Sequence, residues 1–149
     1  MTGAVNVVRR LFDAVERRDA EAVLACYAAD VEIREAAVLP YGGTWRGHDG
    51  ALAHAQAFLA AWDPFQGSAE IKLDPQFWGD DSGRVCVLFR HRALNPTRGT
   101  RLDAPEVSIY QVYGGKVVRS QMFHADSAAV AQFLADAQPD ATTTERAQS

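Results

Sequence analysis

The sequence predicts an α+β domain in which a curved, mainly antiparallel sheet forms a cone on N-terminal helices around one open-ended apolar pocket. Apolar residues near the N-terminus recur at helical spacing, whereas the second half of the chain reads as long strands joined by hairpin turns. The length of 149 residues, with 48% hydrophobic and 23% charged residues, indicates one globular domain. Long antiparallel strands after a helical block are typical of the α+β class.

The N-terminal segment is expected to form two helices. The first has an apolar stripe with charged residues between its members. The stripe consists of Val5, Val8, Phe12 and Val15. Asp19 is placed to cap a second, short helix that contains Tyr27 and ends at Asp30.

The next elements are a strand, a short strand and a third helix. Residues 31–35 alternate with period two, and residues 44–46 lie between two glycine clusters. Residues 51–62 have a helical apolar stripe that Pro64 ends.

The second half of the chain is expected to form four strands and a last helix. The strands cover residues 69–78, 84–94, 100–113 and 116–125, and the helix starts near Asp126. The folded domain is expected over residues 1–137. The polar residues 138–149 are expected to be a disordered tail.

Composition excludes several classes of protein. A formal net charge of -4 argues against nucleic-acid binding, which needs a basic surface. There is no apolar stretch of membrane-spanning length and no leader-type N-terminus, so a cytoplasmic protein without a membrane contact is expected. The four histidines have no metal-ligand spacing and there is no phosphate-binding loop, so neither metal nor cofactor is expected.

Three stretches, residues 34–50, 104–117 and 120–129, together with the order of the elements, resemble the SnoaL-like members of the nuclear-transport-factor-2-like superfamily. This superfamily includes polyketide cyclases, ketosteroid isomerases, scytalone dehydratase and limonene epoxide hydrolase. The resemblance implies a cone-shaped fold with an apolar pocket, and a homodimer. SnoaL-type cyclases place an aspartate after a tryptophan on the last strand, where this chain has Gln121-Met122-Phe123-His124. The resemblance therefore implies a pocket but no particular mechanism.

Glu35, His124 and Tyr41 are the candidate catalytic residues. Strand alternation places Glu35 on one face with Val31 and Ile33, and burial there would make it a usable acid or base. His124 shares a face with Val118, Ser120 and Met122 and could act as a general base. Tyr41, beside two glycines, could donate to a carbonyl or line the pocket mouth. Each also has a structural alternative: a solvated Glu35, a core His124 and a packed Tyr41.

Other side chains are candidates for binding the substrate. Asp126 could orient His124, although it also reads as a helix N-cap. Met122 and several aromatic residues could line the pocket, although core packing is the default for aromatic residues. The aromatic candidates are Trp45, Phe58 and Trp62, with Trp78 as a further one. Arg90-His91-Arg92 is read as solvated sheet surface or a dimer face, with binding of an anionic substrate as the alternative.

The expected function is a cofactor-independent cyclase or isomerase that acts on an apolar polyketide- or terpenoid-like small molecule of secondary metabolism. The chemistry would be proton transfer, or confinement of a conformer that closes a ring in a pericyclic reaction. Two alternatives stay open: a non-catalytic binding protein, and an epoxide hydrolase or dehydratase on the same fold. The outer face of the sheet is expected to form a homodimer.

Overall fold

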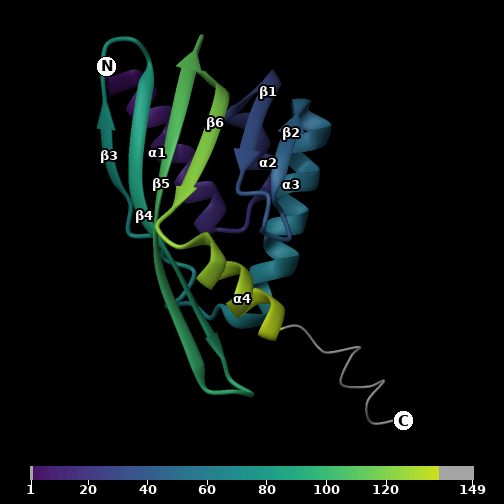
Figure 1. Cartoon of the computed structure of the whole chain (residues 1–149). Helices are drawn as coiled ribbons and strands as arrows, with labels where there is room; N and C mark the ends of the chain where they lie inside the picture. Colours follow the sequence, from purple (N-terminus) through teal and green to yellow (C-terminus); the bar gives the residue numbers. More distant parts are fainter. Residues whose placement is uncertain (1, 138–149) are drawn as a thin grey trace.

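The computed structural model describes residues 2–137, which form a curved six-stranded sheet with helices on its concave face. Figure 1 shows the sheet in front and the helices α1 and α3 behind it. The α+β prediction is confirmed. The predicted tail at residues 138–149 lies outside the described residues.

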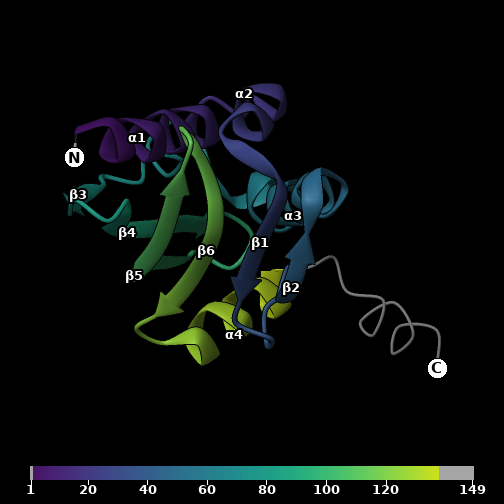
Figure 2. The same ribbon diagram turned by 90° about the horizontal axis from the view of Figure 1, so that it is seen from above.

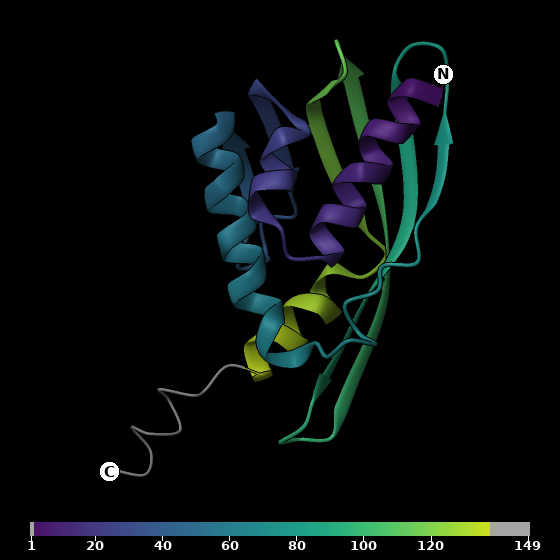
Figure 3. The same cartoon turned by 180° about the vertical axis from the view of Figure 1, so that it is seen from behind.

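The helices are α1 (Thr2–Glu16), α2 (Ala20–Ala25), α3 (Gly47–Trp62) and α4 (Ser127–Ala137), with a short 3-10 helix η1 (Asp63–Phe65). The view from behind in Figure 3 shows α1 and α3 crossing the inner face of the sheet, with α4 beneath them. None of the helices in residues 2–137 combines the length and the apolar character that crossing a membrane requires.

The strands are β1 (Tyr27–Glu35), β2 (Gly43–Arg46), β3 (Gln76–Gly79), β4 (Arg84–Asn95), β5 (Thr100–Tyr113) and β6 (Lys116–His124). Their order in the sheet is β2-β1-β6-β5-β4-β3. The β1–β6 pair is parallel, and the other pairs are antiparallel.

Two predicted element boundaries are wrong. Tyr27 begins β1 and does not belong to α2, because the Cys26 N–H closes the helix on the carbonyl groups of Val23 and Leu24 and the Cys26 carbonyl accepts from Val117 of β6. The strand predicted over residues 69–78 is reduced to β3. The Ile71 N–H is used in a local turn, where it donates to the Gly67 carbonyl.

The core has two parts that leave room for a site between them. Under α1, Phe12 meets the rings of Phe89 and Tyr110 edge-on at 5.0 and 6.0 Å. At the other end, Trp62 and Tyr41 pack with α4 residues such as Leu134. Between these two clusters the concave face of the sheet carries polar side chains.

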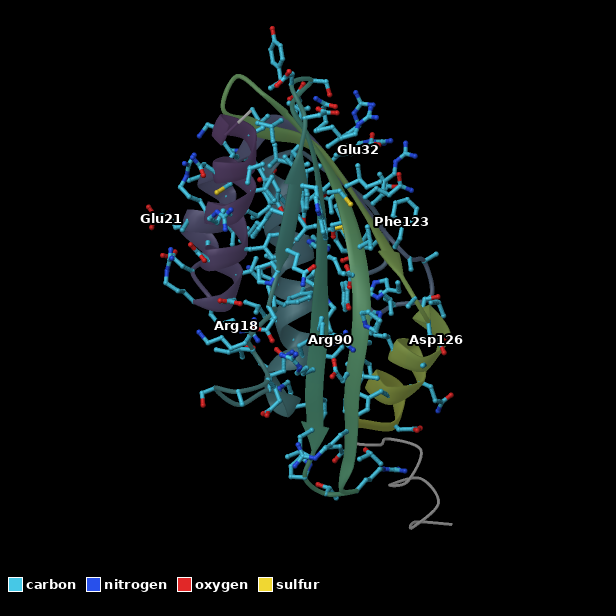
Figure 4. The ribbon with its side chains drawn as sticks, turned by 90° about the vertical axis from the view of Figure 1, so that its left-hand side faces the viewer. Arg18, Glu21, Glu32, Arg90, Phe123 and Asp126 are labelled. Carbon is cyan, nitrogen blue, oxygen red and sulfur yellow. The ribbon has the colours of Figure 1, made fainter. Side chains whose placement is uncertain are left out.

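The two faces of the sheet differ in character. Figure 4 shows Arg18 and Glu21 on the helix side, whereas Glu32 and Phe123 project from the opposite, outer side of the sheet. The outer face has no cover within residues 2–137, and it carries several exposed apolar side chains.

Candidate functional site

A cavity of about 90 Å³ lies between the concave face of the sheet and the helices α1, α2 and α3. Its apolar wall comes from both layers and includes Leu11, Val15, Phe58, Leu59, Phe89 and Met122. The α1–α2 turn, with Arg18 and Asp19, also borders the cavity. The wall of the cavity is therefore mainly apolar.

Two buried carboxylates form a polar floor. Glu35 ends β1 and Glu106 lies in the middle of β5, and both line the cavity. The side chain of Glu35 is 3% exposed and that of Glu106 is 2% exposed. Carboxylates that are this deeply buried need partners, because an isolated charge in the interior is costly.

Histidines supply these partners. His54 of α3 lies with Nε2 3.1 Å from Glu35 Oε2. His124 at the end of β6 stands between the two carboxylates, with Nε2 3.6 Å from Glu35 Oε1 and Nδ1 3.2 Å from Glu106 Oε1. Neither His124 contact has regular hydrogen-bond geometry, so both are mainly charge interactions.

Stacked rings of His91 and Trp62 lie beside Glu106. His91 of β4 places Nε2 2.9 Å from Glu106 Oε1, and its ring lies on the Trp62 indole at 4.9 Å and 16°. Trp62 Nε1 donates to the Tyr41 hydroxyl oxygen at 2.9 Å. The orientation of His91 is thus fixed from behind by two further buried aromatic side chains.

The pKa values follow from this pairing. Burial alone would raise the pKa of Glu35, but its contacts with His124 and His54 outweigh burial and hold that pKa below the ordinary value of 4.5. Burial alone would lower the pKa of His124, but Glu35 and Glu106 hold it above 6.5. Near neutral pH the floor therefore offers the ionised carboxylate of Glu35 as a base, and the neighbouring imidazolium of His124 keeps it ionised.

The same floor contains the residues that could hold a metal ion. Glu35, Glu106 and His124 each offer one ligand atom, and these atoms lie within 4.8 Å of one another. They come from three different strands, which ligand spacing along the sequence cannot detect. The prediction that the protein uses no metal stays a prediction.

The structure brings part of the predicted site together. Glu35, Phe58 and Met122 line the cavity. His124 contacts Glu35 as strand alternation predicts, but it is not among the residues that line the cavity. The expected alternation of β6 fails at Val118, because a bulge there puts the neighbouring Val117 inside instead.

Other predicted residues lie elsewhere. Tyr41 is fully buried beside Trp62, so its expected position at the pocket mouth is wrong. Trp45 lies against His54 at 5.8 Å, outside the cavity wall, and its Nε1 donates to the Tyr41 carbonyl. Asp126 is exposed at the start of α4, where Oδ1 accepts from the Ala129 N–H at 2.9 Å. Asp126 is thus a helix cap away from the cavity.

Sequence reasoning missed Glu106, His54 and His91. The interpretation of Arg90-His91-Arg92 as surface is wrong for His91, which is 3% exposed. The signal was present, since His91 alternates in phase with the buried Val87 and Phe89. Glu106 is likewise in phase with the buried Tyr110 on β5.

Comparisons with known proteins agree with this architecture. The sequence profile of the SnoaL-like domain matches residues 8–120. Uncharacterized protein Rv0034 of Mycobacterium tuberculosis (strain ATCC 25618 / H37Rv) is 33% identical over 131 residues, which are 88% of this chain and 95% of that protein.

Solved structures share the fold. TerC, co-crystallized with polyporic acid, has a TM-score of 0.74 at 20% identity, covering 89% of this chain and 98% of its own. An NTF2-like protein of unknown function from Burkholderia pseudomallei K96243 has a TM-score of 0.72 at 25% identity. The match covers 87% of this chain and 96% of that protein. With the profile match over most of the chain, these similarities show that the protein belongs to the SnoaL-like family of the NTF2-like superfamily.

Proposed function

We propose that the protein is an isomerase or cyclase that moves a proton on an apolar small molecule bound in the cavity. The observation that carries the proposal is the pairing of two buried carboxylates, Glu35 and Glu106, across the imidazole of His124. One group can remove a proton from the substrate while a neighbouring group returns a proton elsewhere, which is the requirement of an isomerisation or of a ring closure through an enolate.

The roles follow from position. Glu35 lines the cavity and is the base, and Glu106, also at the cavity surface, is the second carboxylate. His124 and His54 act as positioning residues that keep Glu35 ionised and oriented. The apolar wall suits a polyketide- or terpenoid-like substrate, and the similar protein TerC was crystallised with a small molecule, polyporic acid.

The proposal is tested by exchange of carbon-bound hydrogen. The wild-type protein is incubated in D2O with acetophenone, a small apolar ketone, and NMR follows the loss of its methyl protons. We expect exchange at least about 100-fold faster than in buffer, the lower end of general-base catalysis. Binding of acetophenone without accelerated exchange would instead indicate a non-catalytic binding protein.

The pH dependence of this exchange is a further expected outcome. The base is lost as pH falls through the depressed pKa of Glu35, below 4.5, and the imidazolium is lost as pH rises through the elevated pKa of His124, above 6.5. Exchange above the buffer background should therefore be greatest between these limits, and the apparent pKa values belong to the interacting pair of Glu35 and His124. A rate that rises steadily across pH 4–9 would contradict these roles.

Repeating the exchange measurement after treatment with a chelator tests whether the reaction needs a metal ion. Proton transfer by these side chains alone predicts the same exchange rate before and after treatment with EDTA. A stoichiometric metal in the purified protein, together with loss of exchange when it is removed, would show that the floor works through an ion.

A homodimer through the outer sheet face belongs to the same proposal. Four exposed apolar side chains lie in two neighbouring rows across β3 to β6: Trp78, Leu88, Ile109 and Phe123. An apolar area of this kind favours association. Light scattering at micromolar concentration should give the mass of two chains, and Phe123→Asp should lower it toward one.

The matched control is Val38→Asp, which places the same charge at another exposed apolar position, outside these rows. This variant should keep the wild-type mass. A wild-type mass of one chain would contradict the dimer.

A further inference from the structure

The floor of the cavity has buried polar atoms that its own contacts do not satisfy. Within residues 2–137, Glu35 Oε1, Glu106 Oε1 and both ring nitrogens of His124 have no partner of regular hydrogen-bond geometry. The three side chains are between 1% and 3% exposed. Buried polar atoms in a native protein nearly always have a partner. Four such atoms in one cluster therefore indicate a further group that binds between the two carboxylates.

The same three side chains have the geometry of a metal site. Glu106 and His124 are paired across β5 and β6, and β1, which ends at Glu35, lies next to β6. One ligand atom from each residue lies within 4.8 Å of the other two. Three ligand atoms at about 2.1 Å from a zinc ion lie about 3.4 Å apart, so each atom needs to move by only about 1 Å or less. Three neighbouring strands thus hold the ligands almost in place.

Other histidines hold the two carboxylates from outside this set. His54 Nε2 lies 3.1 Å from Glu35 Oε2, which leaves Glu35 Oε1 for an ion. His91 Nε2 lies 2.9 Å from Glu106 Oε1, and the Trp62 indole stacked on its ring fixes the orientation of His91. Groups that hydrogen-bond to metal ligands orient them and commonly raise metal affinity. The floor therefore contains the ligands together with the residues that support them.

The ligand atoms favour zinc among the common divalent cations. Two carboxylates balance the charge of a divalent ion, and a buried ion without such balance is costly. One imidazole nitrogen with carboxylate oxygens is a ligand set that suits Zn²⁺ and its spectroscopic substitute Co²⁺. Mg²⁺ and Ca²⁺ instead prefer six or more ligands that are all oxygen. The cluster of Glu35, Glu106 and His124 should therefore bind Zn²⁺ much more tightly than Mg²⁺ or Ca²⁺.

We propose that Glu35, Glu106 and His124 form a zinc site in the floor of the cavity, and that bound Zn²⁺ inhibits proton transfer by occupying Glu35. A carboxylate oxygen that coordinates the ion no longer offers its lone pair to a proton of the substrate. Binding of the ion does not depend on the proposed function, whereas the inhibition rests on it. The pH dependence of exchange described above accordingly refers to the metal-free protein.

Calorimetry tests the site directly. The protein is treated with EDTA, freed of the chelator and titrated with Zn²⁺. We expect one ion per chain with a dissociation constant on the order of 1 µM or lower. Glu106→Gln and His124→Gln each remove a ligand and should weaken binding by at least about 100-fold. His54→Gln removes only a supporting contact and should weaken it by about 10-fold. Millimolar Mg²⁺ or Ca²⁺ should not displace the zinc.

Two matched controls remove the same chemical groups elsewhere. His48→Gln changes an exposed histidine at the start of α3, and Glu32→Gln changes a carboxylate on the outer face of β1. Both variants should keep the wild-type affinity for Zn²⁺. Co²⁺ gives a second readout, because a nitrogen and oxygen ligand set shows visible absorption bands. Glu106→Gln should change these bands, which a merely structural role of Glu106 would not cause.

The exchange of acetophenone protons tests the inhibition. Zn²⁺ added to the metal-free protein should lower the exchange rate toward the buffer background, with half inhibition near the dissociation constant from calorimetry. His48→Gln should be inhibited in the same way. If the wild-type protein shows no exchange at all, the proposed function fails while calorimetry still decides the zinc site.

Several results would overturn the proposal. One is a wild-type protein that binds no stoichiometric Zn²⁺ at micromolar concentration. Another is an unchanged affinity in both Glu106→Gln and His124→Gln. Exchange that persists or rises at full zinc occupancy would disprove the inhibition. If the ligand variants do not fold, as judged by circular dichroism, His54→Gln and the Co²⁺ spectrum of the wild-type protein still decide the question.

Discussion

Glu35→Gln should lower the rate of acetophenone proton exchange by about 100- to 10,000-fold, the usual range for loss of a general base. The amide keeps the size of the side chain, and its oxygen can still face His54, which lies 3.1 Å from Glu35 Oε2. What it loses is the ability to accept a proton. Binding of the ketone should change much less, so the effect should fall on turnover.

The matched control for this variant is Glu32→Gln. Glu32 lies on the same strand, but it belongs to the outer face and pairs there with Arg34 and Arg46. This change should leave the exchange rate within about twofold of the wild-type value, since surface ion pairs contribute little. If Glu35→Gln also leaves exchange unchanged, the cavity acts by holding a conformer and Glu35 is structural.

The position of Glu35 was predictable because it depends on local alternation alone. From Val31 to Glu35 every second side chain points into the protein, so one apolar pair sets the direction of the carboxylate. The same rule placed His124 in phase with Met122. It failed at Val118, because a bulge shifts the register of β6 against β5 there, and a single sequence gives no clear sign of such a shift.

Residues that become a site through contacts between distant segments were harder to predict. His91 lies between two arginines, so the segment looks like surface, and only its pairing with Glu106 and Trp62 explains a buried imidazole. The prediction that Tyr41 lies at the pocket mouth failed for the opposite reason. A glycine-rich turn is usually exposed, but here α4 packs over it in the second core cluster. At Gly42 a Cβ atom would lie 2.2 Å from the Ala36 carbonyl oxygen, so the turn is closed tightly enough to bury Tyr41.

Trp62→Ala should strongly destabilise the fold, lowering the free energy of unfolding by about 3–5 kcal/mol. Trp62 is fully buried and its indole stacks on the His91 ring at 4.9 Å, so its truncation leaves a cavity beside His91. The change also removes the donor to the Tyr41 hydroxyl, which would stay buried. The thermal midpoint should fall by about 10 °C for a domain of this size, measured by circular dichroism or calorimetry.

Two further variants separate packing from the hydrogen bond. Trp62→Phe keeps much of the ring volume and loses the donor, so its cost should be well below that of Trp62→Ala. Tyr113→Ala truncates an aromatic side chain that is 80% exposed and should change the unfolding free energy by no more than about 0.5 kcal/mol. Because Trp62 orients His91 on Glu106, Trp62→Phe should also slow exchange in the folded protein. Equal stability of Trp62→Ala and Tyr113→Ala would mean that the second core cluster does not hold the site.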